Sequence, residues 1–408
     1  MPKTRCLTIR WGAYGDLLYC LPTLEALKRE YGYLHLETGS RGKMLFAHHP
    51  AFDRISEFDV GKYPVAEHMK VAELRWKALE DAGWDKVVNF WRCLEVSCIA
   101  EEGQEEFFYP RERRKEIFSG RNFYETHFRK AGLPIPEPFD CGTFHFDDAT
   151  AFWMEKWKKD HGDTFSVAIA LCGSTGQKVP FYMKELAREI IDSFPGTNIY
   201  LVGNKEAQSQ EFTFGEKNVC HTSGTWSYLQ SLALMKLVDY VIGPETSLLV
   251  GAGMFGTPKS MICTSCGVEQ ATKYHKNDFS IQSTYKCSPC YRAIYNYQGK
   301  ASQRFCNFEE THLGHIPGCN LYYDKNKILE GVEFAYNVRG LRRSIERIEG
   351  TRYGSLPDLR TLRDSEPNRD KEVRPVVSAE IRRVRDDGAR KGREPVQVES
   401  CRAVSGGQ

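Results

Sequence analysis

The sequence predicts an α/β protein with two doubly wound parallel sheets and a tail that lacks a core. Three observations support this prediction. Short apolar runs alternate with segments of helical period through both halves of the 408-residue chain, which is typical of parallel sheets covered by helices. The first strand of each half opens into a turn rich in glycine and small residues. Large apolar side chains become rare near the C-terminus. The predicted boundaries are 1–155 and 156–348 for the two domains and 349–408 for a disordered tail.

Composition restricts the class of protein. At one domain for roughly 150 residues the length predicts two to three domains, and the hydrophobic content of 41% is enough for real cores. The formal net charge of +2 gives no strong field toward nucleic acid, so no such partner is expected. No run approaches the roughly 20 apolar residues of a membrane span, and the first residues lack the apolar stretch of a signal peptide. We therefore expect a cytoplasmic protein.

The first elements are a strand over 6–9, the turn Arg-Trp-Gly-Ala-Tyr-Gly-Asp, and a helix over 17–31. Gly12 and Gly15 allow a tight turn and, without a Cβ, the close approach of a ligand. Asp16 has two interpretations. It caps the helix, which is worth about 1 kcal/mol, or it places a carboxylate at the edge where open α/β sheets bind ligands. The residues alone leave both roles open.

The rest of the first half continues the alternation of strand and helix. Alternating or continuous apolar runs predict strands over 34–37, 54–58 and 84–90. Helical periodicity predicts helices over 70–82, 122–131 and 152–161. The charged segment 101–115 is expected to be irregular.

The second half opens with a strand over 165–171 that leads into Cys-Gly-Ser-Thr-Gly-Gln-Lys. Backbone N–H groups and hydroxyls in such a loop bind oxyanions, and a lysine adds positive charge. Ser174, Thr175 and Lys178 are therefore candidate phosphate ligands. The Gly-Lys-Ser/Thr order of a Walker A loop is absent, and many loops share this composition.

Two later strands of the second half also precede polar residues. A strand over 198–202 precedes Glu206, which either accepts hydrogen bonds from ribose hydroxyls or starts a helix at the surface. A strand over 240–242 precedes a helix start whose free N–H groups favour a phosphate by roughly 0.3–1 kcal/mol. The residues at this start are Glu245, Thr246 and Ser247. The remaining predictions are helices over 183–194, 248–255 and 325–347 and a strand over 259–263.

Most of the 14 cysteines lie singly in apolar runs, which is typical of buried reduced thiols. Two Cys-x2-Cys pairs, however, have the spacing of a zinc site. One grouping joins both pairs, Cys263, Cys266, Cys287 and Cys290. Because Cys263 ends the strand predicted over 259–263 and its side chain can belong to the core, the preferred grouping is Cys287, Cys290, Cys306 and Cys319, with His312 and His315 as reserve ligands. Either set would hold a structural zinc, and the alternative is cysteine without a metal.

These motifs resemble glycosyltransferase family 9, the heptosyltransferases of lipopolysaccharide assembly. That family opens with a strand, a turn ending in Gly-Asp and an apolar helix with Pro and Leu-Lys, matched here by Gly15-Asp16, Pro22 and Leu27-Lys28. Lys178 and the Gly-x-Pro segment that ends at Pro258 also match. The chain departs from the family pattern in two motifs. A tryptophan before Pro180 is lost, and Glu245, Ser247 and Val250 stand in the places of an aspartate, a glycine and a histidine.

The resemblance, over roughly residues 5–348, implies the GT-B fold, in which two Rossmann-like domains face each other across a cleft. It implies an inverting glycosyltransferase with Asp16 as general base. The first domain would bind a saccharide or lipopolysaccharide-type acceptor, and the second a nucleotide-diphosphate sugar, ADP-heptose in the family. The implied donor-binding residues are Ser174, Thr175, Lys178, Glu206, Glu245, Thr246 and Ser247. No cofactor would be required for catalysis, and contact with the inner membrane face would be peripheral at most.

Two alternatives remain. The loss of the histidine at Val250 is also expected of a degenerate protein that binds a nucleotide sugar without turning it over. An adaptor built on a zinc-binding cysteine module would show a basic patch beside the cysteines and no deep cleft near Asp16. A nicotinamide-dependent dehydrogenase is disfavoured, because no Gly-x-Gly-x-x-Gly follows either first strand.

Overall fold

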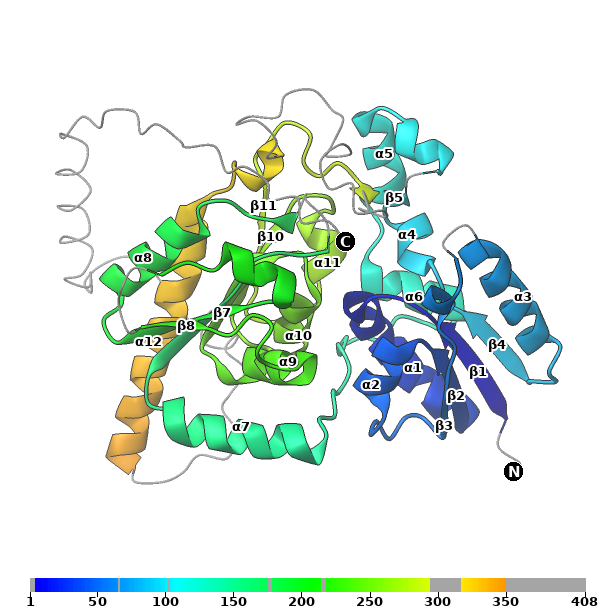
Figure 1. The fold of residues 1–408 in the computed structure, drawn as a ribbon, viewed down its shortest axis with the longest axis horizontal. Helices are drawn as coiled ribbons and strands as arrows, with labels where there is room; N and C mark the ends of the chain where they lie inside the picture. The colour runs from blue at the N-terminus through cyan, green and yellow to red at the C-terminus, as the bar shows by residue number, and fades with distance from the viewer. Residues whose placement is uncertain are drawn as a thin grey trace, which may run out of the picture. The chain divides into compact units, whose positions relative to one another are not determined.

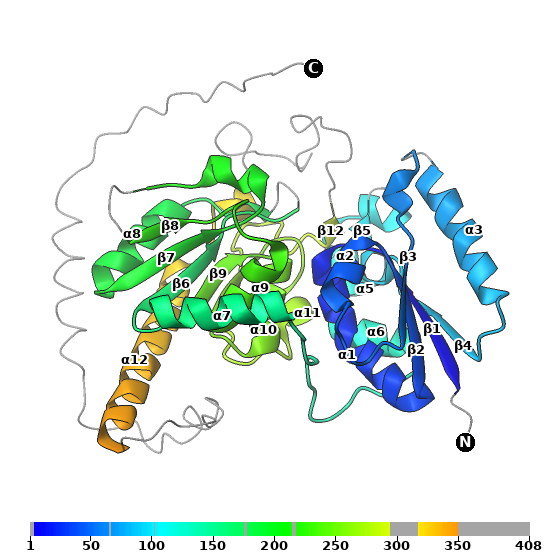
Figure 2. The same ribbon diagram turned by 60° about the horizontal axis from the view of Figure 1, so that its bottom comes forward.

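A computed structural model describes residues 4–64, 67–101, 103–174, 178–213, 218–293 and 317–349. The chain divides into two compact units, Met1–Arg360 and Thr361–Gln408. The first unit contains a four-stranded and a six-stranded parallel sheet (Figures 1 and 2). The tail prediction, beyond Glu349, lies outside the described residues. In the described part of the chain no helix is long and apolar enough to cross a membrane.

The N-terminal sheet has four parallel strands in the order β3-β2-β1-β4. The strands are β1 (Arg5–Arg10), β2 (Tyr33–Thr38), β3 (Arg54–Glu57) and β4 (Lys86–Asn89). Side chains of a strand alternate between the two faces of its sheet. Accordingly Cys6 packs in the core under α1, whereas Leu7 packs in the core under α3. Because β1 pairs with β2 on one side and with β4 on the other, its carboxyl end places the following turn within the sheet edge rather than at its margin.

The C-terminal sheet has six parallel strands in the order β11-β10-β9-β6-β7-β8. They are β6 (Phe165–Ala170), β7 (Thr197–Val202), β8 (Val219–His221), β9 (Tyr240–Pro244), β10 (Lys259–Cys263) and β11 (Ile281–Gln282). On β6 the same alternation sends Val167 and Ile169 to one core and Ala168 and Ala170 to the other. The order reverses beside β6, and ligands of open α/β sheets bind at such a switch point.

Helices cover both sheets on both faces (Figure 1). The N-terminal half has α1 (Tyr14–Tyr31), α2 (Ser40–Phe46), α3 (His68–Glu80), α4 (Cys93–Ser97), α5 (Arg111–Phe118) and α6 (Phe123–Ala131). The C-terminal half has α7 (Asp148–His161), α8 (Met183–Ser193), α9 (Tyr228–Leu237), α10 (Ser247–Phe255), α11 (Val268–Thr272) and α12 (Lys325–Glu349). Short 3-10 turns lie at Val60–Lys62, Glu105–Phe108, Lys205–Gln210 and Gly318–Asn320, and β5 (Ala100–Glu101) pairs with β12 (Arg292–Ala293).

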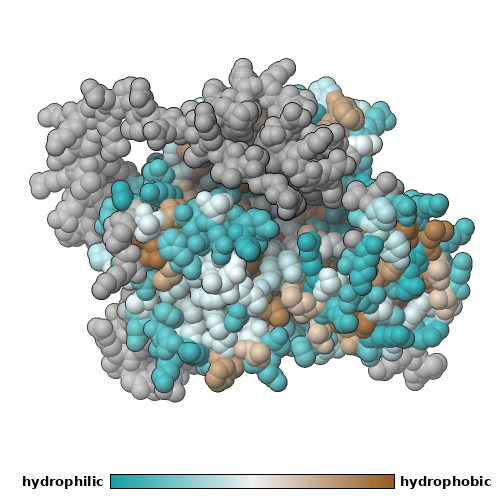
Figure 3. Space-filling model, viewed as in Figure 1, coloured by the Kyte–Doolittle hydropathy of each residue, from teal (hydrophilic) through white to brown (hydrophobic). Residues whose placement is uncertain are grey.

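One apolar core joins the two halves. It contains residues of α1, such as Leu17 and Leu21, together with residues of α10, such as Leu248 and Leu249. A Cβ built on Gly15 would lie 3.7 Å from Ser247 Cα, so the first turns of α1 and α10 lie side by side. The two helix N-termini, which carry partial positive charge, therefore meet at one place between the sheets. Where Figure 3 colours the surface by hydropathy, it is mostly hydrophilic, with apolar residues in small separate groups.

The predicted fold class is confirmed, but several elements differ in their bounds or were not predicted. Helices α2 and α4 were not predicted, and α7 begins at Asp148 rather than residue 152. The first helix begins at Tyr14 rather than residue 17, so Gly15 lies in a helical turn and Asp16 in the first turn. The charged segment expected to be irregular contains the α5 helix. Its Arg114 is buried and donates to the carbonyl of Cys290 at 2.7 Å, a contact that periodicity does not reveal.

Candidate active site

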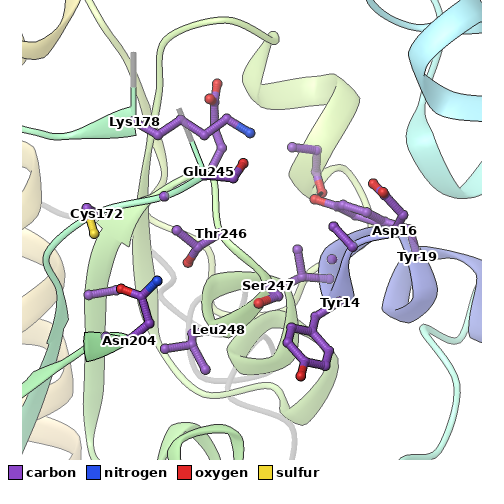
Figure 4. A pocket seen from close by; sticks show the side chains of 18 of the residues that line it. Tyr14, Asp16, Tyr19, Cys172, Lys178, Asn204, Glu245, Thr246, Ser247 and Leu248 are labelled. Carbon is purple, nitrogen blue, oxygen red and sulfur yellow. Dashed lines mark hydrogen bonds between the residues drawn. The ribbon is translucent and has the colours of Figure 1, made fainter. Parts of the chain in front are cut away.

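A cavity of about 530 Å³ lies between the two sheets. The N-terminal half contributes Asp16 to its wall, and the C-terminal half contributes Ser174, Lys178, Thr246 and Ser247. Figure 4 shows Asp16 and Lys178 on opposite walls of this cavity. The structure therefore brings together residues that were predicted from motifs about 160 and 230 positions apart in the chain.

Asp16 is held by a buried arginine. The Arg10 Nη2 atom lies 3.1 Å from Asp16 Oδ2, and the Arg10 side chain is fully buried, whereas a quarter of the Asp16 side chain is exposed. The other terminal nitrogen of Arg10, Nη1, donates to the carbonyl of Phe90 at 2.9 Å, which fixes the guanidinium. Ala13, not Asp16, is the N-cap of α1, so the capping interpretation is wrong. Asp16 lies in the first turn of the helix and lines the cavity.

The electrostatic environment makes Asp16 a stronger base than an ordinary aspartate. Burial, the largest influence, and the nearby Glu95 carboxylate raise the pKa of Asp16 from 3.8 to about 6, although Arg10, Lys178 and the Ala13 N–H favour its charged form. An efficient general base has a pKa near the working pH. A carboxylate in this range is ionised at pH 7 and accepts a proton readily.

The glycine loop after β6 places Lys178 in the cavity wall. The N–H of Gly173 donates to the carbonyl of Lys178 at 2.6 Å. A Cβ at Gly173 would lie 2.7 Å from Lys178 Cβ and 2.9 Å from its Cδ. Glycine is therefore required here, because any larger residue would displace the lysine stem. Ser174 is exposed and lines the cavity, and Thr175 lies outside the described residues.

The start of α10 offers free donors to the same cavity. Its N-cap, Thr246, makes no capping hydrogen bond through its side chain. Thr246 Oγ1 is buried and has no hydrogen-bond partner among the described residues. Because the first N–H groups of a helix have no partner within the helix, this end can bind an anion together with Ser247.

Glu245 and Glu206, which were also predicted to bind the sugar donor, are placed differently from Lys178 and Thr246. The carboxylate of Glu245 lines the cavity, but it accepts backbone N–H bonds from Thr264 (2.7 Å), Ser265 (3.0 Å) and Cys266 (3.1 Å). Its oxygens thus order the loop after β10. Glu206 is exposed on the turn after β7 and does not line the cavity, whereas Asn204 does.

Several wall residues were not predicted from the sequence. The Tyr14 and Tyr228 rings come from opposite halves and stack at 3.6 Å between centroids. Arg41 of α2 lies over the Tyr14 ring, 5.6 Å from its centroid, and Glu95 of α4 lines the cavity beside Arg10. A sequence signal existed for Tyr14 alone, since it lies inside the first glycine turn.

The cysteines form one candidate metal group in the part of the chain that the structure describes. The ligand atoms of Glu245, Cys263 and Cys266 lie within 4.8 Å of one another. This group does not include Cys287 or Cys290, with which Cys263 and Cys266 were paired in one predicted grouping. In the preferred set, Cys290 and Cys319 are buried and Cys287 is half-buried, whereas Cys306, His312 and His315 lie outside the described residues.

Comparison with known proteins bears on the fold. No protein-family model matches the chain, and no curated protein matches it. The structure of a glycosyl transferase family 9 protein from Veillonella parvula covers 82% of this chain and 97% of its own, with a TM-score of 0.55 at 10% identity. The ADP-heptose lipopolysaccharide heptosyltransferase II of E. coli covers 83% of this chain and 100% of its own, with a TM-score of 0.53 at 11% identity. At such identities the likeness establishes the GT-B fold.

Proposed function

We propose that the protein is an inverting glycosyltransferase that moves a heptose-like sugar from a nucleotide-diphosphate donor to a saccharide or lipopolysaccharide-type acceptor. The observation that carries this proposal is the shared cavity, which has a basic carboxylate on one wall and a lysine with a free helix start on the other. The similar E. coli protein is named for ADP-heptose, which makes ADP-heptose the first donor to test.

In the proposed reaction the acceptor hydroxyl attacks the anomeric carbon of the donor. Asp16 takes the hydroxyl proton, the new C–O bond forms, and the bond from the anomeric carbon to the diphosphate oxygen breaks. Attack from the face opposite the leaving group inverts the anomeric centre. A positioned base contributes about 10²–10⁴-fold, so Asp16→Asn should lower kcat by that factor.

The diphosphate leaves with additional negative charge. Lys178 and the first N–H groups of α10, with Thr246 and Ser247, supply donors on that wall of the cavity. Such preorganised groups stabilise charge that develops in the transition state. The proposed transfer therefore requires no cofactor. Ser174 and Thr175 are further proposed donor ligands. Glu206 does not line the cavity, and it is proposed to contact a ribose that extends past Asn204 toward the turn after β7.

A thermal-shift screen with ADP, GDP, UDP, CDP and dTDP tests the donor class. A ligand at 100 times its Kd stabilises the folded state by about 2.7 kcal/mol. One diphosphate should raise the melting temperature of the wild type and lose this effect in Lys178→Ala. If none of the five raises it, the transferase proposal loses its main support.

Val250 favours a second candidate, a degenerate protein that binds a nucleotide sugar. Its side chain is 3% exposed in the cavity wall, where it offers no hydrogen bond. Such a protein would be stabilised by a nucleoside diphosphate but would leave the donor intact. Release of the nucleoside diphosphate from donor and acceptor, absent in Asp16→Asn, would exclude this alternative. An adaptor without a cleft is disfavoured, because Asp16 does line a cavity.

We further propose a structural zinc held by Cys287, Cys290, Cys306 and Cys319. Its support is that α5 arginines hold the first pair through backbone carbonyls: Arg111 donates to that of Cys287 at 3.2 Å, and Arg114 to that of Cys290. Elemental analysis should find one zinc per chain, lost in Cys287→Ser and kept in Cys220→Ser. Loss in Cys263→Ser alone would assign the metal to the Glu245 group instead, and less than stoichiometric zinc in the wild type would remove both sites.

A further inference from the structure

Arg10, Asp16 and Glu95 form a largely buried charged group. It contains one more carboxylate than is needed to neutralise the guanidinium of Arg10. Arg10 Nη2 lies 3.1 Å from Asp16 Oδ2 and 3.6 Å from Glu95 Oε1, so one guanidinium faces two carboxylates. Burial opposes the charge on Arg10, but Glu95 and Asp16 together raise the pKa of its guanidinium, which therefore stays charged. With both acids ionised, this small group carries a net negative charge in a largely dry place.

The hydrogen bonds of the Glu95 carboxylate are incomplete for a residue whose role is only structural. Only 13% of its side chain is exposed, and its Oε2 atom is buried without a hydrogen-bond partner among the described residues. A buried carboxylate oxygen without a donor costs free energy, and one acid, Asp16, would already neutralise Arg10. Departures of this kind from local stability rules tend to occur at functional sites.

We propose that Glu95 is a positioning residue for Asp16: by sharing the Arg10 guanidinium it keeps Asp16 able to accept a proton near neutral pH. This inference rests on the proposed role of Asp16 as general base. Arg10 alone would make Asp16 a weak base, because an opposite charge at this distance favours the ionised form of a carboxyl group. The second negative charge opposes that effect without removing the guanidinium that forms the ion pair with Asp16.

The other groups around Asp16 do not supply this effect. Lys178, from the loop after β6, favours the ionised form of Asp16, as Arg10 does. Tyr19 and Cys20 on α1 and Cys93 on α4 are neutral at pH 7, since burial raises the pKa of each, that of Cys93 to about 11. Among the described residues Glu95 is thus the negative group that acts on Asp16.

Carbon-13 NMR of protein labelled at the aspartate side-chain carboxyl measures the midpoint of Asp16 directly and requires no substrate. The Asp16 resonance is identified by its absence in Asp16→Asn. We expect a midpoint near pH 6 in the wild type, as the pKa of about 6 implies, and a fall of about one pH unit or more in Glu95→Gln. Glu95→Asp, which keeps the charge, should retain most of the high midpoint.

Glu155→Gln is the matched control, because Glu155 pairs with Lys158 on the exposed side of α7, away from the cavity. If Glu95→Gln folds poorly, Glu95→Ala removes the same charge without burying an amide. A wild-type midpoint at the ordinary value of aspartate, or an unchanged midpoint in both charge-removing variants, would overturn the inference. Neither result would alter the nucleotide screen, so failure here and failure of the proposed function can be told apart.

Discussion

Substitution of Gly173 offers the sharpest test of the proposed diphosphate site, because it moves Lys178 without removing it. In Gly173→Ala the new Cβ would lie 2.7 Å from Lys178 Cβ and 2.9 Å from Lys178 Cδ. These distances are shorter than real Cβ contacts, and the nearer atom belongs to the fixed base of the side chain. The loop must therefore shift, which also strains the 2.6 Å bond from the Gly173 N–H to the Lys178 carbonyl.

The expected loss is that of one charge-assisted hydrogen bond to phosphate. Such bonds contribute about 1.5–3 kcal/mol, which corresponds to about 10- to 150-fold weaker binding. Isothermal titration calorimetry with the diphosphate found in the screen measures this change. Gly120→Ala is the control, since a Cβ at Gly120 meets no atom within 4 Å.

A double-mutant cycle makes the test specific. If Gly173→Ala acts by displacing Lys178, it should cost little more when Lys178→Ala is already present, because coupled residues are not additive. Fully additive losses, or unchanged affinity in Gly173→Ala, would refute the assignment of Lys178 to the diphosphate.

Two further predictions concern the charges behind the site. Arg10→Met should lower the free energy of unfolding at pH 7 by about 3–5 kcal/mol in urea denaturation, because two carboxylates would lose their buried cation. Arg113→Met, at the exposed pair with Glu116, should cost less than about 1 kcal/mol, and equal losses would contradict the reasoning. Because the pKa of Asp16 is higher in the folded chain than in the unfolded chain, its contribution to stability is complete below pH 4 and is lost as the pH rises through 6. Asp16→Asn should therefore gain up to about 3 kcal/mol relative to the wild type between pH 4 and pH 7, and a flat difference across this range would rule out the raised pKa.

Much of the fold was predictable because its signals are local. Apolar periodicity and terminal residues placed β10 at its observed bounds, Lys259–Cys263, and α10 within one residue of its observed start at Ser247. Burial on both faces makes the strands of a parallel sheet continuous apolar runs, and such runs can be read one segment at a time. For the same reason the turn containing Asp16 and the loop containing Lys178 could be recognised before any contact between them was known.

The identity of the partners around each candidate depended on the tertiary structure. The sequence could not show that the Glu245 carboxylate is occupied by the N–H groups of Thr264, Ser265 and Cys266, some 20 residues later. It also could not show that Glu95, on a short helix, shares Arg10 with Asp16.

The sequence by itself determined most of the strands and long helices, and which motifs end at a sheet edge, because hydrophobic periodicity and glycine placement act over a few residues. The tertiary structure decided which of those motifs share a cavity and how basic Asp16 is. Both depend on burial and on charges brought together from distant parts of the chain, and electrostatic interactions of this kind are set by distance in space rather than by separation in sequence.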